Sequence, residues 1–367
     1  MEYKNKKLLK LKEFLEKNQL SAFLFSSSSN VFYLSKFKST NAYIIITKNN
    51  QYFLTDARYY EKAKEEIKDY EVIQIKDNTI KFLKNFLRSL EIKTLGFEKD
   101  KVSCEFKEKL RTKGIKLKGF SRVLKDFRII KDEEEIKIIK DGIKKTDKVY
   151  KSFLEELKKQ LKKQIFLTEL NLRGILVYKM FEVGASGESF PSIIASGSHS
   201  AIPHWESSYQ EIKLNAPLLV DMGLIWKGYC TDFTRTLFIG KPDEEFKKMY
   251  EIVKTAWYKG FERVKRGVSI AEIDKTIREY FQEKGLAEYF IHATGHGVGV
   301  EIHEAPRIFY KNSEEGIIED GMVFTIEPGL YFPGKYGIRL ENIIIVENGR
   351  GENFSEIDLD LKVIDLL

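Results

Sequence analysis

LLVDMGLIWKGYCTDFTRTLF, residues 218–238, consists of two apolar, β-forming runs with one aspartate in each. If a hairpin turns between Trp226 and Lys227, Asp221 and Asp232 stand directly opposite each other. Cross-strand neighbours on one face have Cβ atoms roughly 4.5–5.5 Å apart. Two like charges repel by about 1 kcal/mol at 4 Å in bulk water, and by more in a cleft of lower dielectric. The pattern therefore predicts either a functional carboxylate pair or a slipped register in which the two aspartates never meet.

Two further acids occur in apolar surroundings nearer the C-terminus, Glu327 in VFTIEPG and Glu341 in YGIRLENIII. Carboxylates in such surroundings are rarely left unpaired. With the two aspartates they bring four negative charges, which two divalent cations would balance. All five histidines also fall in one part of the chain: His199, His204, His292, His296 and His303. Imidazole is a common metal ligand near neutral pH, so the grouping favours one site in the second half of the chain.

An oxygen-rich ligand set completed by one imidazole, here His296, suits manganese, cobalt, iron or zinc, and ligand softness alone does not choose among them. Two metal ions roughly 3.5–4 Å apart generate a hydroxide at neutral pH and stabilise both sides of a hydrolytic transition state. The residues therefore predict a dinuclear metallohydrolase.

The order of the motifs Asp221-Met-Gly, Gly228-Tyr-Cys-Thr-Asp232, His292-Ala-Thr-Gly-His296-Gly, Glu327-Pro-Gly and Arg339-Leu-Glu341-Asn resembles that of the pita-bread metallopeptidases. This family includes the Xaa-Pro aminopeptidases and the Xaa-Pro dipeptidases, or prolidases. The resemblance implies two divalent metal ions, with manganese first and cobalt, zinc or iron as alternatives. The ligands that it implies are Asp221, Asp232, His296, Glu327 and Glu341.

The resemblance also implies roles for individual residues. Asp232 and Glu341 would bridge the metals, and Glu327 would also act on the metal-bound water. His204 matches the histidine near the scissile bond, and His303 matches the one that steadies the tetrahedral intermediate. Two further residues match positions on the substrate side, namely His292 and Arg339.

The first part of the chain resembles the N-terminal domain of prolidases and creatinase, in Asn30-Val-Phe-Tyr-Leu and Leu54-Thr-Asp-Ala-Arg-Tyr. Short β runs alternate there with amphipathic helices, which is typical of a mostly parallel α/β layered domain. Later, paired helices accompany an antiparallel sheet. Asp132 with Glu135, and Ser269 with Glu272, predict capped helix starts. We expect an α+β protein with an N-terminal domain over 1–125 and a pita-bread catalytic domain over 126–367.

Composition excludes several classes of protein. Lys and Arg number 62 against 55 Asp and Glu, for a net charge of +7, but the two signs alternate along the chain instead of forming the stripe that nucleic acid requires. Two distant cysteines form no disulfide framework, and no apolar run is long enough for a membrane span. We therefore expect a cytoplasmic protein that binds neither nucleic acid nor membrane. The family resemblance also implies that the protein forms a homodimer.

The expected activity is metal-dependent hydrolysis of an N-terminal Xaa-Pro bond in a proline-containing peptide, as by an Xaa-Pro aminopeptidase. The alternatives are an Xaa-Pro dipeptidase, which would recognise the free carboxylate of proline, and a non-catalytic binding protein, which would bind no metal. Two departures from the family pattern concern specificity. This chain has Gly197-Ser-His199 where many members of the family carry Asn after Gly, and it has Trp205 after His204 where Gly is common. Cys230 is expected to be a small strand residue that could also approach the metals.

Overall fold

The computed structural model describes residues 2–163, 166–311 and 316–365, and the chain forms two compact units, Met1–Phe127 and Arg128–Leu367. Side chains cap the starts of most long helices by accepting a backbone N–H. Such caps occur at Ser27, Asp56, Asn78, Ser103, Asp132, Thr168 and Asp243.

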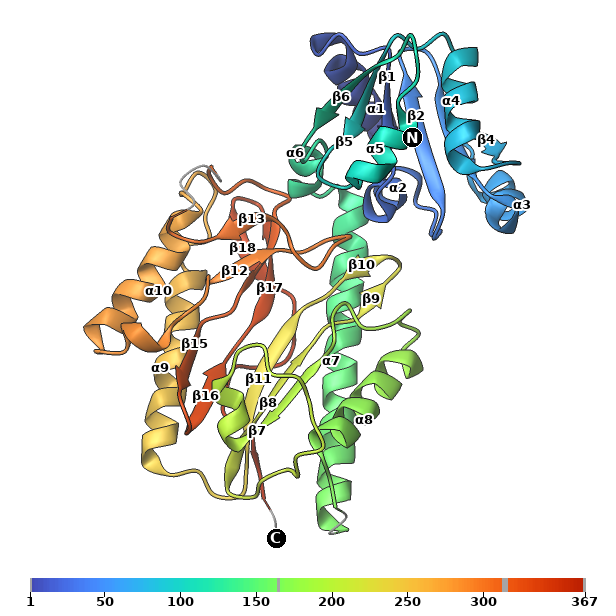
Figure 1. Ribbon diagram of the computed structural model, residues 1–367. Helices are drawn as coiled ribbons and strands as arrows, with labels where there is room; N and C mark the ends of the chain where they lie inside the picture. Colours follow the sequence, from blue (N-terminus) through green and yellow to red (C-terminus); the bar gives the residue numbers. More distant parts are fainter. Residues whose placement is uncertain (1, 164–165, 312–315, 366–367) are drawn as a thin grey trace. The chain divides into compact units, whose positions relative to one another are not determined.

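The first unit is built on a six-stranded sheet in the order β4-β3-β2-β1-β5-β6. Three of its five strand pairs are parallel. Alternate residues of β1 face opposite sides: Phe23 packs against Phe14 of α1, and Leu24 joins a core with Leu83 of α4. This is the layered α/β arrangement that the sequence predicts (Figure 1). The elements are α1 (Glu2–Lys17), β1 (Ala22–Phe25), α2 (Ser28–Ser35), β2 (Ala42–Thr47), β3 (Gln51–Thr55), α3 (Ala57–Glu66), β4 (Glu71–Gln74), α4 (Thr79–Ser89), β5 (Thr94–Glu98), α5 (Cys104–Leu110), β6 (Lys116–Phe120) and α6 (Lys125–Ile129).

The second unit has two main sheets, β19-β11-β8-β7 and β13-β12-β14-β17-β18, with one pair of long helices on each outer side (Figure 1). The helices are α7 (Glu133–Lys162), α8 (Glu169–Glu182), α9 (Glu244–Phe261) and α10 (Ala271–Glu283). The strands and short helices are β7 (Ile193–Ser196), η1 (Gly197–Ala201), β8 (Ala216–Met222), β9 (Ile225–Trp226), β10 (Tyr229–Cys230), β11 (Phe233–Ile239), η2 (Ala287–Tyr289), β12 (Gly295–Gly297), β13 (Glu304–Ile308), β14 (Val323–Ile326), β15 (Gly329–Phe332), β16 (Tyr336–Arg339), β17 (Asn342–Glu347), β18 (Arg350–Asn353) and β19 (Val363–Ile364).

Strand periodicity decides which side chains face away from the helices. On β8, Val220 and Met222 join the core under α7 and α8, so Asp221 faces the other way. On β14, Phe324 and Ile326 join the core under α9 and α10, so Thr325 faces the other way. The polar side chains of both sheets therefore gather on the faces that the helices leave uncovered.

The two predicted helix starts had different outcomes. Asp132 and Glu135 form the reciprocal capping box that begins α7. The prediction for Ser269 and Glu272 was wrong, because α10 begins after Ile270 and no side chain caps it. Ser269 instead accepts the Glu272 N–H through its backbone carbonyl, which leaves its hydroxyl without the capping role.

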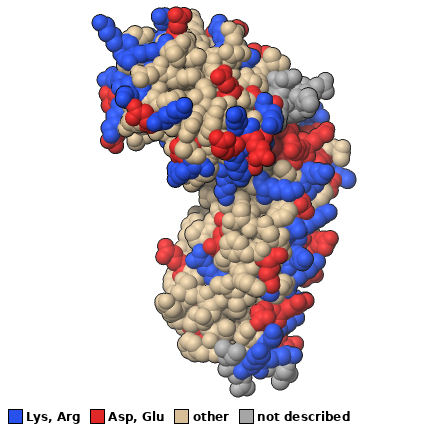
Figure 2. Space-filling view, turned by 90° about the vertical axis from the view of Figure 1, so that its right-hand side faces the viewer, with Lys and Arg blue, Asp and Glu red and all other residues tan. Residues whose placement is uncertain are grey.

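One face of the molecule carries charges of both signs (Figure 2). On the face shown in Figure 2, Lys and Arg side chains lie among Asp and Glu side chains, without a continuous area of one sign. None of the helices in the described ranges combines the length and apolar character that crossing a membrane requires.

Candidate metal centre

The β8–β11 hairpin positions the two aspartates, but not in the register expected. Trp226 pairs with Tyr229, so the turn is Lys227-Gly228, and further along Asp221 pairs with Thr234. Lys227 and Gly228 both have positive φ, as a two-residue type I′ turn requires. The prediction that Asp221 and Asp232 are directly opposite was therefore wrong. They are offset by two residues, which keeps both on the same face.

The second sheet brings the glutamates and His296 together. Ile326 of β14 pairs with Asn342 of β17, so the next residues outward, Glu327 and Glu341, adjoin each other across the two strands. Strand β12, which carries His296, pairs with β14 on the other side. A backbone bridge between Thr234 and Glu341 then joins the two sheets. Antiparallel register thus gathers ligand-type residues that are far apart in sequence.

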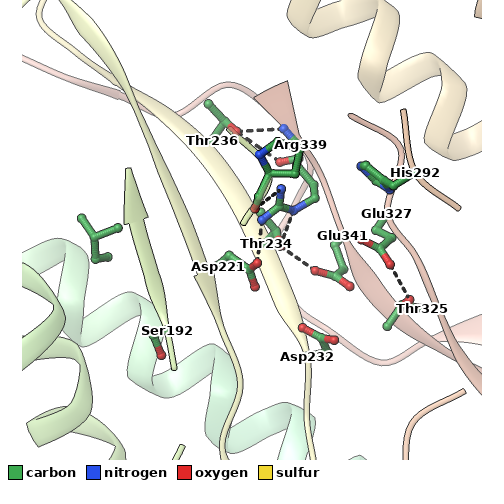
Figure 3. A network of polar contacts seen from close by, with 12 residues as sticks. Ser192, Asp221, Asp232, Thr234, Thr236, His292, Thr325, Glu327, Arg339 and Glu341 are labelled. Carbon is green, nitrogen blue, oxygen red and sulfur yellow. Dashed lines mark hydrogen bonds and ion pairs between the residues drawn. The ribbon is translucent and has the colours of Figure 1, made fainter. Parts of the chain in front are cut away.

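The resulting group is compact, as Figure 3 shows for the four acids. Asp232, His296 and Glu341 each offer one ligand atom, and these atoms lie within 4.8 Å of one another. The Nε2 of His296 is 3.4 Å from Asp232 Oδ2 and 3.7 Å from Glu327 Oε1. Asp221 is buried beside them and is bound on its other side by Arg339.

Burial and mutual repulsion disfavour the charged state of these acids. Burial, followed by the negative charge of Asp221, raises the pKa of Glu341 to about 8. Burial and the charge of Glu341 likewise hold the pKa values of Asp232 and Glu327 well above their ordinary values. Such an arrangement of acids calls for a compensating cation.

The donor set fits divalent metal ions. Within the described residues, the buried Oδ1 of Asp221 has no hydrogen-bond donor, although a buried oxygen of this kind is normally satisfied. Burial, followed by the proximity of His303, lowers the pKa of His296 to about 4, so its imidazole is neutral and able to ligate. Four carboxylates with one neutral imidazole are the oxygen-rich set that hard or borderline divalent cations prefer.

A polar chain supports Asp221 from behind. Arg339 donates from Nη2 to Asp221 Oδ2 at 2.6 Å and from Nη1 to the hydroxyl of Tyr331 at 2.8 Å. Tyr331 lies 2.8 Å from Nε2 of His292, whose Nδ1 lies 2.7 Å from the carbonyl of Ala293. Arg339 and His292 are therefore fully engaged with protein groups. Tyr331 was not singled out from the sequence, since nothing in Gly329-Leu-Tyr331 distinguishes it from a core residue.

Hydroxyl groups orient the glutamates. The Thr234 hydroxyl donates to Glu341 Oε2 at 2.5 Å, and that of Thr325 to Glu327 Oε1 at 3.5 Å (Figure 3). Neither threonine was predicted from the sequence, although Thr234 lies two residues after Asp232 and Thr325 lies two residues before Glu327. That spacing is the signal that would have identified them, because residues two apart on a strand share a face.

The histidines divide into two groups. The rings of His296 and His303 meet edge to face, with centroids 4.2 Å apart. Burial lowers the pKa values of His303 and His292, and the proximity of His204 contributes further to both shifts. These four lie around the acids, whereas His199 is bound to Glu169, 2.8 Å from its Oε1.

The glycines beside His296 and the thiol of Cys230 have packing roles in the predicted site. A Cβ on Gly295 or Gly297 would lie 2.0 Å from the carbonyl oxygen of Thr325 or 2.1 Å from that of Ala305. These glycines therefore permit close backbone approach. Cys230 is buried, its Sγ lies 3.6 Å from the Val300 carbonyl, and burial raises its pKa to about 12. In this arrangement the thiol lies against the Val300 carbonyl and outside the group of Asp232, His296 and Glu341.

Comparison with known proteins identifies the family. Residues 137–348 match the model of metallopeptidase family M24, and residues 7–130 match that of the creatinase/prolidase N-terminal domain. The chain belongs to metallopeptidase family M24. The resemblance inferred from the motifs is thus confirmed, and so is the two-domain α+β architecture. The carboxylate and imidazole cluster lies within the M24 match, which supports a role for it in divalent metal binding.

Relatives of this M24 protein match over nearly the whole chain. An Xaa-Pro dipeptidase of Pyrococcus horikoshii is 35% identical and covers 98% of this chain and 100% of its own. The structure of an Xaa-Pro dipeptidase from Bacillus anthracis aligns with a TM-score of 0.91 at 32% identity, covering 98% and 99% of the two chains. An X-Pro aminopeptidase from Thermotoga maritima aligns with a TM-score of 0.86 at 32% identity, covering 94% and 98%.

Proposed function

We propose that this M24 metallopeptidase hydrolyses the bond between a first residue and a following proline. The observation that carries the proposal is the convergence of Asp232, His296 and Glu341 into one ligand group beside Asp221 and Glu327. The Xaa-Pro names of relatives that match at full length support the choice of substrate. An Xaa-Pro bond is a tertiary amide without N–H, so a site made for it needs no acceptor at that nitrogen.

Two divalent cations would be held by Asp221, Asp232, His296, Glu327 and Glu341. When bound, such cations lower the pKa of a water molecule and polarise the scissile carbonyl. Manganese is the first choice and a homodimer the expected assembly, both on the family resemblance alone. Metal analysis and sedimentation would test these two points.

The chain's own groups then handle the protons and the developing charge. Glu327 Oε1 accepts the proton of the attacking water and later releases it to the proline nitrogen. His303 is neutral at pH 7 because its pKa is lowered, so it can donate one N–H to the developing oxyanion, together with His204. Donors placed in advance where charge develops stabilise a transition state more than a ground state.

Arg339 and His292 orient the carboxylate of Asp221. The guanidinium of Arg339 holds Oδ2 of Asp221 and so leaves Oδ1 directed toward the metal centre. His292 fixes the Tyr331 hydroxyl, which in turn accepts from Arg339. This chain keeps the Asp221 carboxylate in one orientation before substrate binds.

Substitution of Glu327 by Gln tests the proposal. The variant should lose nearly all hydrolysis of an Xaa-Pro peptide, because an amide cannot accept the proton, while circular dichroism stays unchanged. Glu288→Gln makes the same chemical change at an exposed residue and should leave activity intact. Full activity of the Glu327→Gln variant would refute the assigned role.

The names of several relatives favour a dipeptidase over the aminopeptidase expected from the sequence. A dipeptidase must recognise the free carboxylate of proline, whereas an aminopeptidase must leave room beyond it. Manganese-loaded protein offered Ala-Pro and Ala-Pro-Ala side by side distinguishes the two. Cleavage of both peptides indicates an aminopeptidase, and cleavage of Ala-Pro alone indicates a dipeptidase.

A further inference from the structure

His199 and Trp205, which lie on either side of His204 in the sequence, are in contact with each other. The rings of His199 and Trp205 stack with centroids 3.8 Å apart and an interplanar angle of 27°. His199 lies in η1, and Trp205 follows His204 in the loop after it. The two stacked residues flank, in sequence, the histidine proposed to act at the scissile bond, His204.

Glu169 at the start of α8 binds both rings. Its side chain is fully buried, and it lies 2.8 Å from His199 Nδ1 and accepts at 2.8 Å from Trp205 Nε1. It also accepts from the backbone N–H of Ser196 and from the N–H and hydroxyl of Ser208. A buried carboxylate with this many donors is a rigid anchor. Glu169, His199 and Trp205 are called the loop anchor below.

Trp205 also packs against a small apolar cluster of Ile193, Ala195 and Leu219. Ile193 pairs with Asp221, and Ala195 pairs with Leu219. These residues therefore share the face of the β7–β8 sheet that carries Asp221. The indole of Trp205 therefore contacts His199 and Glu169 as well as the sheet face that carries Asp221.

The loop reaches the metal centre on its other side as well. The carbonyl of Pro203 lies 3.5 Å from Nη1 of Arg339, the residue that holds Asp221. His204, between Pro203 and Trp205, is exposed. The backbone of His204 is consequently held through the contacts of Pro203 and Trp205, while its side chain remains exposed.

We propose that Glu169, His199 and Trp205 are positioning residues that hold loop 202–205 so that His204 is already oriented toward the reacting bond before substrate binds. The inference rests on the proposed function, in which His204 stabilises the developing oxyanion. Preorganised donors need no rearrangement in the transition state, and a displacement of about 1 Å can cost on the order of 100-fold in rate. Loss of the loop anchor should therefore lower kcat more than it raises KM.

A double-mutant cycle tests whether Trp205 acts through His204. Trp205→Ala should lower kcat for Ala-Pro by about tenfold with KM changed less than threefold. In the His204→Ala background, the same substitution should change kcat less than twofold. Equal losses in both backgrounds would overturn the inference. If Trp205→Ala does not fold, His199→Ala takes its place in the cycle.

Conservative variants separate the hydrogen bond from the packing. Trp205→Phe keeps an aromatic ring on His199 but removes the donor to Glu169, so it should retain more kcat than Trp205→Ala. Trp226→Phe is the matched control, because Trp226 Nε1 also donates to a carboxylate, Asp141, at 2.7 Å. That control should keep wild-type kcat, and a loss equal to that of Trp205→Phe would count against the inference.

Hydrogen exchange provides a readout that does not depend on activity. The amides of Ile202 and Trp205 are bonded to the carbonyls of His199 and Ile202, so exchange reports loop order directly. In metal-free protein, Trp205→Ala should speed exchange of peptides covering 202–206 about tenfold and leave α9 unchanged. Unchanged exchange would overturn the inference. A wild-type protein inert toward every Xaa-Pro peptide would instead overturn the proposed function, and the exchange result would still decide whether the anchor orders the loop.

Discussion

The metal-free protein should lose stability as the pH rises from 7.5 to 8.5. The folded pKa of Glu341 is raised to about 8, whereas an unfolded glutamate titrates near 4.3. In this window the folded state holds a proton that the unfolded state lacks. Stability therefore falls as pH rises through the folded pKa. Glu327 and Asp232 have pKa values shifted in the same direction.

The magnitude follows from linkage. Titration of Glu341 alone between pH 7.5 and 8.5 costs about 0.7 kcal/mol, and each of the other two acids adds up to about 1.4 kcal/mol. The lowered pKa values of His292 and His296 oppose this trend only below about pH 7, because above it both imidazoles are neutral in either state. The chosen window therefore excludes the histidines, and the buried Cys230 thiol, whose pKa is also raised, adds a smaller loss in the same direction as the acids.

Urea unfolding with EDTA, followed by tryptophan fluorescence, measures this effect. Trp205, Trp226 and Trp257 all lie in the second unit, so the signal reports the domain that carries the acids. Glu341→Gln should flatten the pH dependence. A wild-type metal-free protein whose stability is constant or increases between pH 7.5 and 8.5 would refute the reasoning.

Three other predictions concern the same centre. Chelation with EDTA should abolish peptide hydrolysis and added manganese should restore it, as a steady-state assay would show; activity that survives exhaustive chelation would contradict a metal centre. Arg339→Ala should weaken metal binding 10–100-fold by chelator competition, because Asp221 loses the group that orients it; unchanged affinity would count against that role. Gly295→Ala should destabilise the fold by about 1–3 kcal/mol in urea unfolding, because its Cβ would lie 2.0 Å from the Thr325 carbonyl oxygen. The control Gly174→Ala should be neutral or stabilising, because its Cβ would meet no atom within 4 Å. Equal effects of the two substitutions would argue against close packing at Gly295.

The fold was largely predictable from the sequence because strand and helix periodicities are strong and local. The register of the hairpin was not, because it depends on which two residues adopt positive φ. Lys227 and Gly228 do so, whereas a turn at Trp226 and Lys227 fits the apolar pattern equally well. Moving the turn by one residue changes the partner of Asp221 from Asp232 to Thr234.

The acids and histidines that lie in recognisable motifs could also be predicted from the sequence. The residues that hold them in place through hydrogen bonds could not. Tyr331 and Glu169 act through contacts between elements distant in sequence, such as Tyr331 with Arg339 and Glu169 with Trp205. A tyrosine in a strand and a glutamate in the first turn of a helix have ordinary structural explanations. Only the tertiary contacts of Tyr331 and Glu169 distinguish them from an ordinary strand tyrosine and an ordinary helix-start glutamate.

Metal content per chain tests the central claim most directly. Wild-type protein loaded with manganese and passed through a desalting column should retain about two ions per chain. The Asp232→Asn/Glu341→Gln variant should retain none, because it loses two of the proposed ligand carboxylates, and its circular dichroism should show a folded chain. A wild-type protein without bound metal, or a variant with undiminished metal content, would contradict the account.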